Sequence, residues 1–145
     1  MNTKNIFLLL FIAASTVLTS CKEEKKTEAT VTNSSQMKAV MAIHDEVMPK
    51  MGKIGRLVGK LKPMIDTTAQ GREYEKAIKN LQGANKAMMT WMQDFGNKFD
   101  SDEIMNGKEL SEQKKIILNT EEENIKMVKE KIESSIANAE ALLKE

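Results

Sequence analysis

From about residue 36 onward, apolar residues recur every three or four positions, which is the spacing of one face of an amphipathic α-helix. Three such stretches cover about residues 37–61, 68–97 and 111–143, and short polar segments separate them. Helices of similar length joined by short connections are expected to pack as antiparallel neighbours. The pattern therefore predicts an all-α fold, an antiparallel three-helix bundle with coiled-coil-like packing.

The first helical stretch contains residues that disfavour a helix. Pro49 removes one backbone hydrogen bond and crowds the preceding turn, so we expect a kink near residues 45–48 rather than a break. Gly52, Gly55 and Gly59 each cost roughly 1 kcal/mol relative to alanine. We expect close packing of a neighbouring helix to explain these glycines.

Residues 97–109 have the composition of a loop. Asp100, Asp102 and Asn106 superficially suggest a calcium-binding loop, because oxygen ligands cluster there. The stretch lacks the ligand spacing, the central glycine and the terminal bidentate glutamate of an EF-hand. We therefore predict a solvated connection, followed by one long third helix.

The first twenty residues are typical of a secretion signal. Lys4 supplies a positive start, and residues 6–14 form an apolar run that is too short to span a bilayer. The next residues, Leu18-Thr19-Ser20-Cys21, resemble a bacterial lipobox, in which the cysteine is lipidated and becomes the first residue of the mature chain. An ordinary secretory signal with an incidental cysteine is the alternative. Several acyl chains on Cys21, palmitate among them, would anchor the protein permanently to a membrane.

The three residues after this cysteine are Lys22, Glu23 and Glu24. A lysine and two acids at this place resemble the surface-export signal of Bacteroidota lipoproteins. The resemblance implies an outer-membrane lipoprotein, with the cell surface favoured over the periplasmic face.

A polar segment separates the cysteine from the helical stretches. Residues 21–35 contain almost nothing apolar, so they cannot bury enough surface to offset the entropy of ordering, and we predict a flexible tether. The chain of 145 residues thus divides into a signal peptide (1–20), the lipidated cysteine with its tether, and one helical domain (36–145).

Composition excludes several classes of function. Lys plus Arg total 22 and Asp plus Glu total 21, so the chain has no long-range field to hold a nucleic acid. One cysteine excludes an internal disulfide, and one histidine disfavours most zinc sites. The sequence contains no nucleophile elbow, no phosphate-binding loop after a strand and no paired Glu-x-x-His motifs. We therefore predict a protein that is not an enzyme.

His44 is the one candidate for a metal ligand, together with Met41 and Met48, which lie three and four residues away on the same helical face. A thioether with an imidazole suits Cu(I), and a histidine with a methionine suits haem iron. Methionine is also a flexible core filler, and a lone histidine on an apolar face is more often a core residue. Packing is the favoured interpretation, and a haem or copper site is the alternative.

Trp91 is the candidate for a partner-binding residue. Tryptophan dominates binding hot spots, so an exposed Trp91 would be a natural anchor for a protein partner. A long heptad-like pattern can also pair with a second copy of the chain. Alternatively, Trp91 fills the core of the bundle.

Two stretches carry a resemblance to a known group of proteins. The segment MKAVMAIHDEVMPKM at residues 37–51 and the segment MMTWMQDF at residues 88–95 resemble small Bacteroidota lipoproteins of uncharacterised function, often labelled "viral A-type inclusion protein". The resemblance covers most of the mature domain and brings no catalytic residues with it. The sequence therefore predicts an outer-membrane-anchored, surface-exposed helical lipoprotein with a non-catalytic binding or structural role at the cell envelope.

Overall fold

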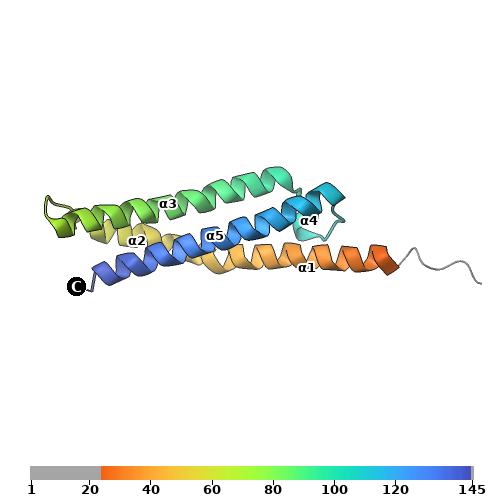
Figure 1. Cartoon of the computed structure of the whole chain (residues 1–145), viewed down its shortest axis with the longest axis horizontal. Helices are drawn as coiled ribbons and strands as arrows, with labels where there is room; N and C mark the ends of the chain where they lie inside the picture. Colours follow the sequence, from red (N-terminus) through yellow and green to blue (C-terminus); the bar gives the residue numbers. More distant parts are fainter. Residues whose placement is uncertain (1–23, 145) are drawn as a thin grey trace, which may run out of the picture.

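The computed structural model describes residues 24–144, and their side chains from residue 33 onward (Figure 1). All regular structure within these residues is helical, so the predicted all-α fold is confirmed. The helices are α1 (Glu24–Val47), α2 (Met51–Leu61), α3 (Ala69–Lys98), α4 (Ser101–Met105) and α5 (Glu112–Leu142), with two 3₁₀ turns, η1 (Met48–Lys50) and η2 (Lys62–Met64).

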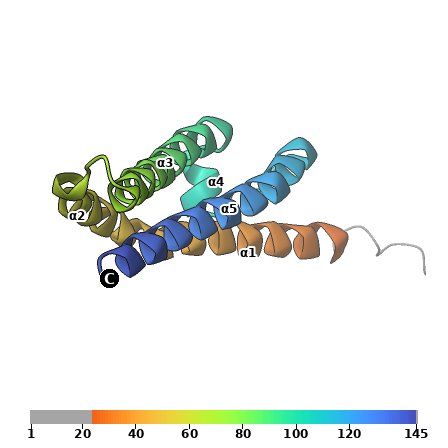
Figure 2. The ribbon, with the colours of Figure 1, turned by 60° about the vertical axis from the view of Figure 1, so that its left-hand side comes forward.

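The helices lie along one long axis. In Figures 1 and 2, α5 lies between α1 and α3, and it packs against both of them, while α2 packs against α3. Figure 1 shows that α1 and α2 follow one another along one side, and that α3 returns in the opposite direction. The turn between α2 and α3 and the C-terminal end of α5 both lie at the end of the molecule away from the start of α1.

The core is built from one face of each long helix. Leu81 and Met88 on α3 are fully buried, as are Leu118, Ile125 and Ile132 on α5. The apolar spacing of α5 continues without a break from Glu112 to Leu142, which confirms the prediction of one long third helix. A continuous apolar stripe on a helix of this length gives the other helices a single surface to pack on.

The seam between α1 and α5 is polar and regular. Gln36 donates a hydrogen bond to Glu122 at 2.7 Å, and Lys129 bonds Glu46 at 2.6 Å. Lys50 bonds Glu133 at 2.5 Å. The partner of each α1 residue lies 83 or 86 positions later in the chain, so α1 and α5 run in the same direction with constant spacing.

Two prolines lie where α-helices end. Pro49 lies in the first turn of η1, which interrupts the α-helix between α1 and α2 where the sequence predicted a kink rather than a break. Pro63 lies in η2, which follows directly after the end of α2. A proline fits these positions because the first residues of a helical turn have no helical partner for their backbone N–H groups.

The structure differs from the prediction at residues 24–35, where it has helix and the sequence favoured a tether. Lysine, glutamate and alanine at residues 24–29 favour a helix, whereas the Thr, Val, Asn and Ser residues at 30–35 do not, so helix propensity explains only part of this extension of α1. The first described side chain that is fully buried in the core is Met37, at 2% exposure. The residues before Met37 therefore extend α1 beyond the part of the helix that packs in the core.

The predicted loop at residues 97–109 contains a short helix, α4, which the sequence analysis missed. The Asp100 side chain accepts a hydrogen bond from the Glu103 N–H at 2.9 Å, and the Glu103 side chain accepts one from the Asp100 N–H at 2.8 Å. This reciprocal capping box satisfies two backbone donors at the start of α4. A hydrogen bond from Lys108 lowers the pKa of Asp100. The acids that suggested calcium thus serve as helix caps and ion-pair partners.

The explanation predicted for the glycines of α2 is wrong. A methyl group built on Gly55 or Gly59 would meet no other atom within 4 Å, so no neighbouring helix approaches them. At Gly71, in the first turn of α3, the backbone of Asp66 does come close. A methyl group there would lie 2.5 Å from the backbone nitrogen of Asp66 and 2.6 Å from its carbonyl oxygen.

Candidate binding groove

The residues predicted for lipidation and export cannot be placed. Cys21, Lys22 and Glu23 lie outside the described residues, and Glu24 is the first residue of α1. Lipid attachment at Cys21 and the export signal therefore stay predictions. No helix of the described part of the chain is long and apolar enough to cross a membrane.

His44 is held by two neighbours on the inner side of α1. Its Nδ1 lies 2.9 Å from Oδ1 of Asp45, and its ring centre lies 6.0 Å from that of Trp91 on α3. Met41 and Met48 are half-buried and pack against the core. Among the residues with described side chains, no group of three or more His, Cys, Asp or Glu residues could hold a metal ion. The contacts shown for His44 are thus a polar contact with Asp45 and a ring contact with Trp91.

A row of aromatic rings continues from His44, formed by Trp91 and Phe95 on α3 and by Phe99 at its C-cap. The ring centres of Trp91 and Phe95 are 4.8 Å apart, and those of Phe95 and Phe99 are also 4.8 Å apart. The side chains meet because residues four apart lie on the same face of a helix. Trp91 is only 5% exposed, which agrees with the interpretation that it fills the core and not with an exposed anchor for a partner. The indole instead fills the core and forms part of a groove wall.

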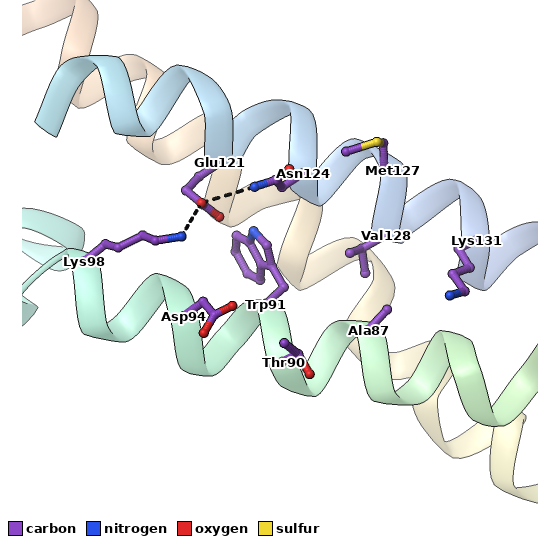
Figure 3. Close-up of a pocket in the computed structure, with 10 residues that line it drawn as sticks. All are labelled: Ala87, Thr90, Trp91, Asp94, Lys98, Glu121, Asn124, Met127, Val128 and Lys131. Atoms are coloured by element: carbon purple, nitrogen blue, oxygen red, sulfur yellow. Dashed lines mark hydrogen bonds and ion pairs between the residues drawn. The ribbon is translucent and has the colours of Figure 1, made fainter.

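That groove lies between α3 and α5 and has a volume of about 370 Å³ (Figure 3). Its walls carry apolar side chains in the middle and charged side chains at the ends. Lys98 and Asp94 lie at one end and Lys131 at the other, as Figure 3 shows. The lining residues are Ala87, Thr90, Trp91, Asp94, Lys98, Glu121, Asn124, Met127, Val128 and Lys131. A hollow of this size is at the lower end of the range for small-molecule sites.

Glu121 is the most deeply buried charged group of the groove, at 2% exposure. Its Oε1 accepts hydrogen bonds from Lys98 Nζ at 2.7 Å and from Asn124 Nδ2 at 3.2 Å. A carboxylate removed from water needs such partners, because an unpaired buried charge costs several kcal/mol. Glu121 and Lys98 therefore tie α5 to the end of α3 across the groove.

Trp91 has a polar atom without a partner. Its indole nitrogen is buried, and it is the one buried side-chain nitrogen or oxygen within the described region that lacks a hydrogen bond. Figure 3 draws this nitrogen on the side of the ring that faces α5, near Glu121 and Asn124. A buried donor without an acceptor costs about 1–3 kcal/mol. Any small shift that gives the indole N–H an acceptor is therefore favourable.

The groove was not predicted from the sequence. An acidic run such as Glu121-Glu122-Glu123 is typical of a solvated face, yet Glu121 is buried while Glu123 is exposed. The available signal was spacing, because Glu121 lies three residues after Leu118 and four before Ile125 in the apolar pattern. The signal did not identify Lys98, whose approach to Glu121 depends on how α3 and α5 align.

Scans against models of known protein families and searches of curated proteins and of solved structures found no match for this chain.

Proposed function

We propose that this protein is a lipoprotein of the outer membrane, anchored through acylated Cys21, with its helical domain on the cell surface and a non-catalytic binding role at the envelope. The lipobox-like segment and the Lys22-Glu23-Glu24 triplet support the location. The resemblance to small Bacteroidota lipoproteins supports it too. The helices form an antiparallel three-helix bundle in this proposal, with α1 and α2 acting as one rod.

The groove between α3 and α5 is the observation that carries the binding role. Its apolar middle favours the apolar part of a ligand, and a small shift that lets the buried indole N–H of Trp91 donate to an acceptor on the ligand is favourable. Lys131, at one end, forms no ion pair with any other described residue, so it is available to an anionic group. The ligand is therefore a small amphiphile with an acceptor or acidic group.

The same residues favour binding over catalysis. A general acid or base must exchange a proton with its substrate. Glu121 is instead held by Lys98 and Asn124. A haem or copper role for His44 with Met41 and Met48 is the less favoured proposal, because the His44 ring already contacts Asp45 and Trp91.

Feeding labelled palmitate to the cells that make this protein tests the anchor. The wild-type chain should take up label and Cys21→Ser should not, because a serine lacks the thiol that is acylated. Protease treatment of intact cells then tests the location, since a surface domain is cut before lysis. An unlabelled wild-type chain would refute the anchor, and a domain resistant until lysis would refute the surface location.

Purification of the protein from its native membrane tests the groove. Extraction and mass spectrometry should find a small amphiphile bound to wild type and lost in Ala87→Met, which places a larger side chain in the groove. Ala137→Met is the matched control, because residue 137 lies exposed on α5 and outside the groove lining. Absence of any such molecule from wild type, or equal retention by both variants, would refute the proposal.

A further inference from the structure

The end of the molecule away from the start of α1 is strongly basic, although the chain as a whole is almost neutral. No acidic residue occurs between Glu46 and Asp66. Five cations occur in the same stretch: Lys50, Lys53, Arg56, Lys60 and Lys62. Such a concentration of one charge in a neutral chain gives the α2 end a local field of its own.

The cations of this stretch divide into two groups. Lys50 pairs with Glu133 at 2.5 Å and Lys53 pairs with Glu140 at 2.7 Å, so these two help to hold α5. The second group is exposed and forms no ion pair within the described region; its members are Arg56, Lys60 and Lys62. No ion pair holds these three side chains away from an external anion, although the charge of Lys60 also acts on Glu140.

Apolar side chains are exposed next to these cations. Met64 is 38% exposed and Ile65 is 41% exposed, and both lie at the turn between α2 and α3. Arg56 and Lys60 are four residues apart, so they lie on one face of α2, and Met64 follows in η2. The open space beside Gly55 and Gly59 shows that no other helix covers this side of α2.

The acids nearest to this end already have partners. Asp66 accepts hydrogen bonds from the hydroxyl and the backbone N–H of Thr68, which lower its pKa. Glu140 is held by Lys53, whose hydrogen bond is the largest cause of its lowered pKa. Both carboxylates are charged at neutral pH, and the free cations still outnumber them.

We infer that this basic tip, defined as Arg56, Lys60, Lys62, Met64 and Ile65, docks on the surface of an anionic lipid bilayer. Cations near an anionic surface and apolar side chains that enter the headgroup region are the two attractions that bind peripheral proteins to membranes. The inference concerns the tip alone, so it stands independently of lipidation at Cys21.

A single-site probe can separate the tip from the rest of the chain. Cys21 is the only cysteine, so the full chain with Cys21→Ser and Ile65→Cys carries one thiol, at the tip, and no acyl chains. A polarity-sensitive fluorophore on this thiol reports contact with lipid. The matched control moves the thiol to Met105→Cys, which is 75% exposed and lies on α4 at the opposite end.

The titration uses phosphatidylcholine vesicles with and without 30% phosphatidylglycerol. The probe at residue 65 should shift to shorter wavelength with the anionic vesicles only, and the probe at residue 105 should not change. Each cation near such a surface is worth a factor of about 5 in partitioning, so Arg56→Gln with Lys60→Gln and Lys62→Gln should weaken binding about 100-fold. The matched triple variant Lys38→Gln, Lys86→Gln and Lys126→Gln removes equal charge from exposed sites elsewhere.

Three results would overturn the inference. One is an equal response of the residue-65 probe to neutral and anionic vesicles. Another is a control triple variant that weakens binding as much as the tip variant does. The third is a response to polyglutamate without a response to anionic vesicles, which would assign the tip to an acidic protein surface. None of these results bears on palmitate labelling, so failure here and failure of the proposed anchor are distinguishable.

Discussion

Glycine-to-alanine substitutions in this protein should change stability in opposite directions at different positions. In an open helical site, alanine is favoured because glycine loses more backbone entropy on folding. Gly55 and Gly59 on α2 are open sites. Gly71 in the first turn of α3 is closed, because Asp66 occupies the space that a methyl group needs.

The magnitudes follow from the contacts. Gly55→Ala and Gly59→Ala should each raise the free energy of unfolding by about 0.5–1 kcal/mol. In Gly71→Ala the new methyl group would lie 2.5 Å from the Asp66 backbone nitrogen, so the turn must move. That movement endangers the cap of α3, in which Thr68 Oγ1 accepts from the Gly71 N–H at 2.9 Å. Loss of a cap costs about 1 kcal/mol, and the displaced turn adds to it, so we expect a net loss of about 2 kcal/mol.

Urea unfolding followed by circular dichroism at 222 nm measures these differences in the Cys21→Ser chain. The order of midpoints should be Gly59→Ala above wild type above Gly71→Ala, with unchanged slopes. Thr68→Ala is a useful companion, since it removes the cap alone and should cost about 1 kcal/mol. A Gly71→Ala chain as stable as wild type would refute the close approach of Asp66. A destabilised Gly59→Ala chain would refute the open face of α2.

Further outcomes test the seam and the groove. Hydrogen bonds from lysine lower the pKa of Glu46 and Glu140 in the folded state. The stability that these two carboxylates contribute is therefore full above the ordinary pKa of 4.5 and is lost as the pH falls below 4.5. A urea midpoint that stays constant from pH 5 to pH 3 would contradict this. Lys98→Met leaves Glu121 buried without its cation and should cost about 2 kcal/mol, and adding Glu121→Gln should restore most of it, as chemical denaturation can check. Trp91 should emit at short wavelength and resist iodide quenching, and quenching as strong as that of free tryptophan would contradict its burial.

Periodicity predicted the long helices well because it reports directly on burial. The stretches expected at residues 68–97 and 111–143 correspond to α3 (Ala69–Lys98) and α5 (Glu112–Leu142). The capping box of α4 was also readable, since Asp100 and Glu103 have the required spacing, but five residues are too few for a periodic pattern. The position of the irregularity at Pro49 followed from the chemistry of proline, which depends little on tertiary context, although the structure has a 3₁₀ turn there instead of a continuous kinked helix.

Features that depend on how helices align were not predictable in this way. Glycine is costly in any helix, so the sequence shows the cost at Gly59 but not whether a neighbour or open space lies beside it. The groove needs Trp91 and Lys98 from α3 to meet Glu121 from α5, and only the relative rotation of the two helices brings them together. Periodicity assigns each residue to a face, but it does not assign a partner to that face.

The charges between α1 and α5 explain how two parallel helices keep one alignment. The pairs Glu46–Lys129 and Lys50–Glu133 are partly exposed, so each contributes little to stability. Their effect on other alignments of α1 and α5 is larger. If α5 slid by one helical turn, Glu46 would lie opposite Glu133 in one direction, and Lys50 would lie opposite Lys129 in the other.

Like charges at contact distance cost free energy in either shifted state, whereas the native alignment pairs opposite charges. The buried faces of α1 and α5 do not discriminate as sharply, because apolar side chains repeat at each turn and tolerate a shift of four residues. The ion pairs therefore select the alignment, and the apolar core supplies the stability. The double substitution Glu46→Lys with Lys129→Glu exchanges the two charges of one ion pair and keeps the pair. It should still lower the free energy of unfolding, because the new lysine at position 46 lies beside Lys50, which has the same charge.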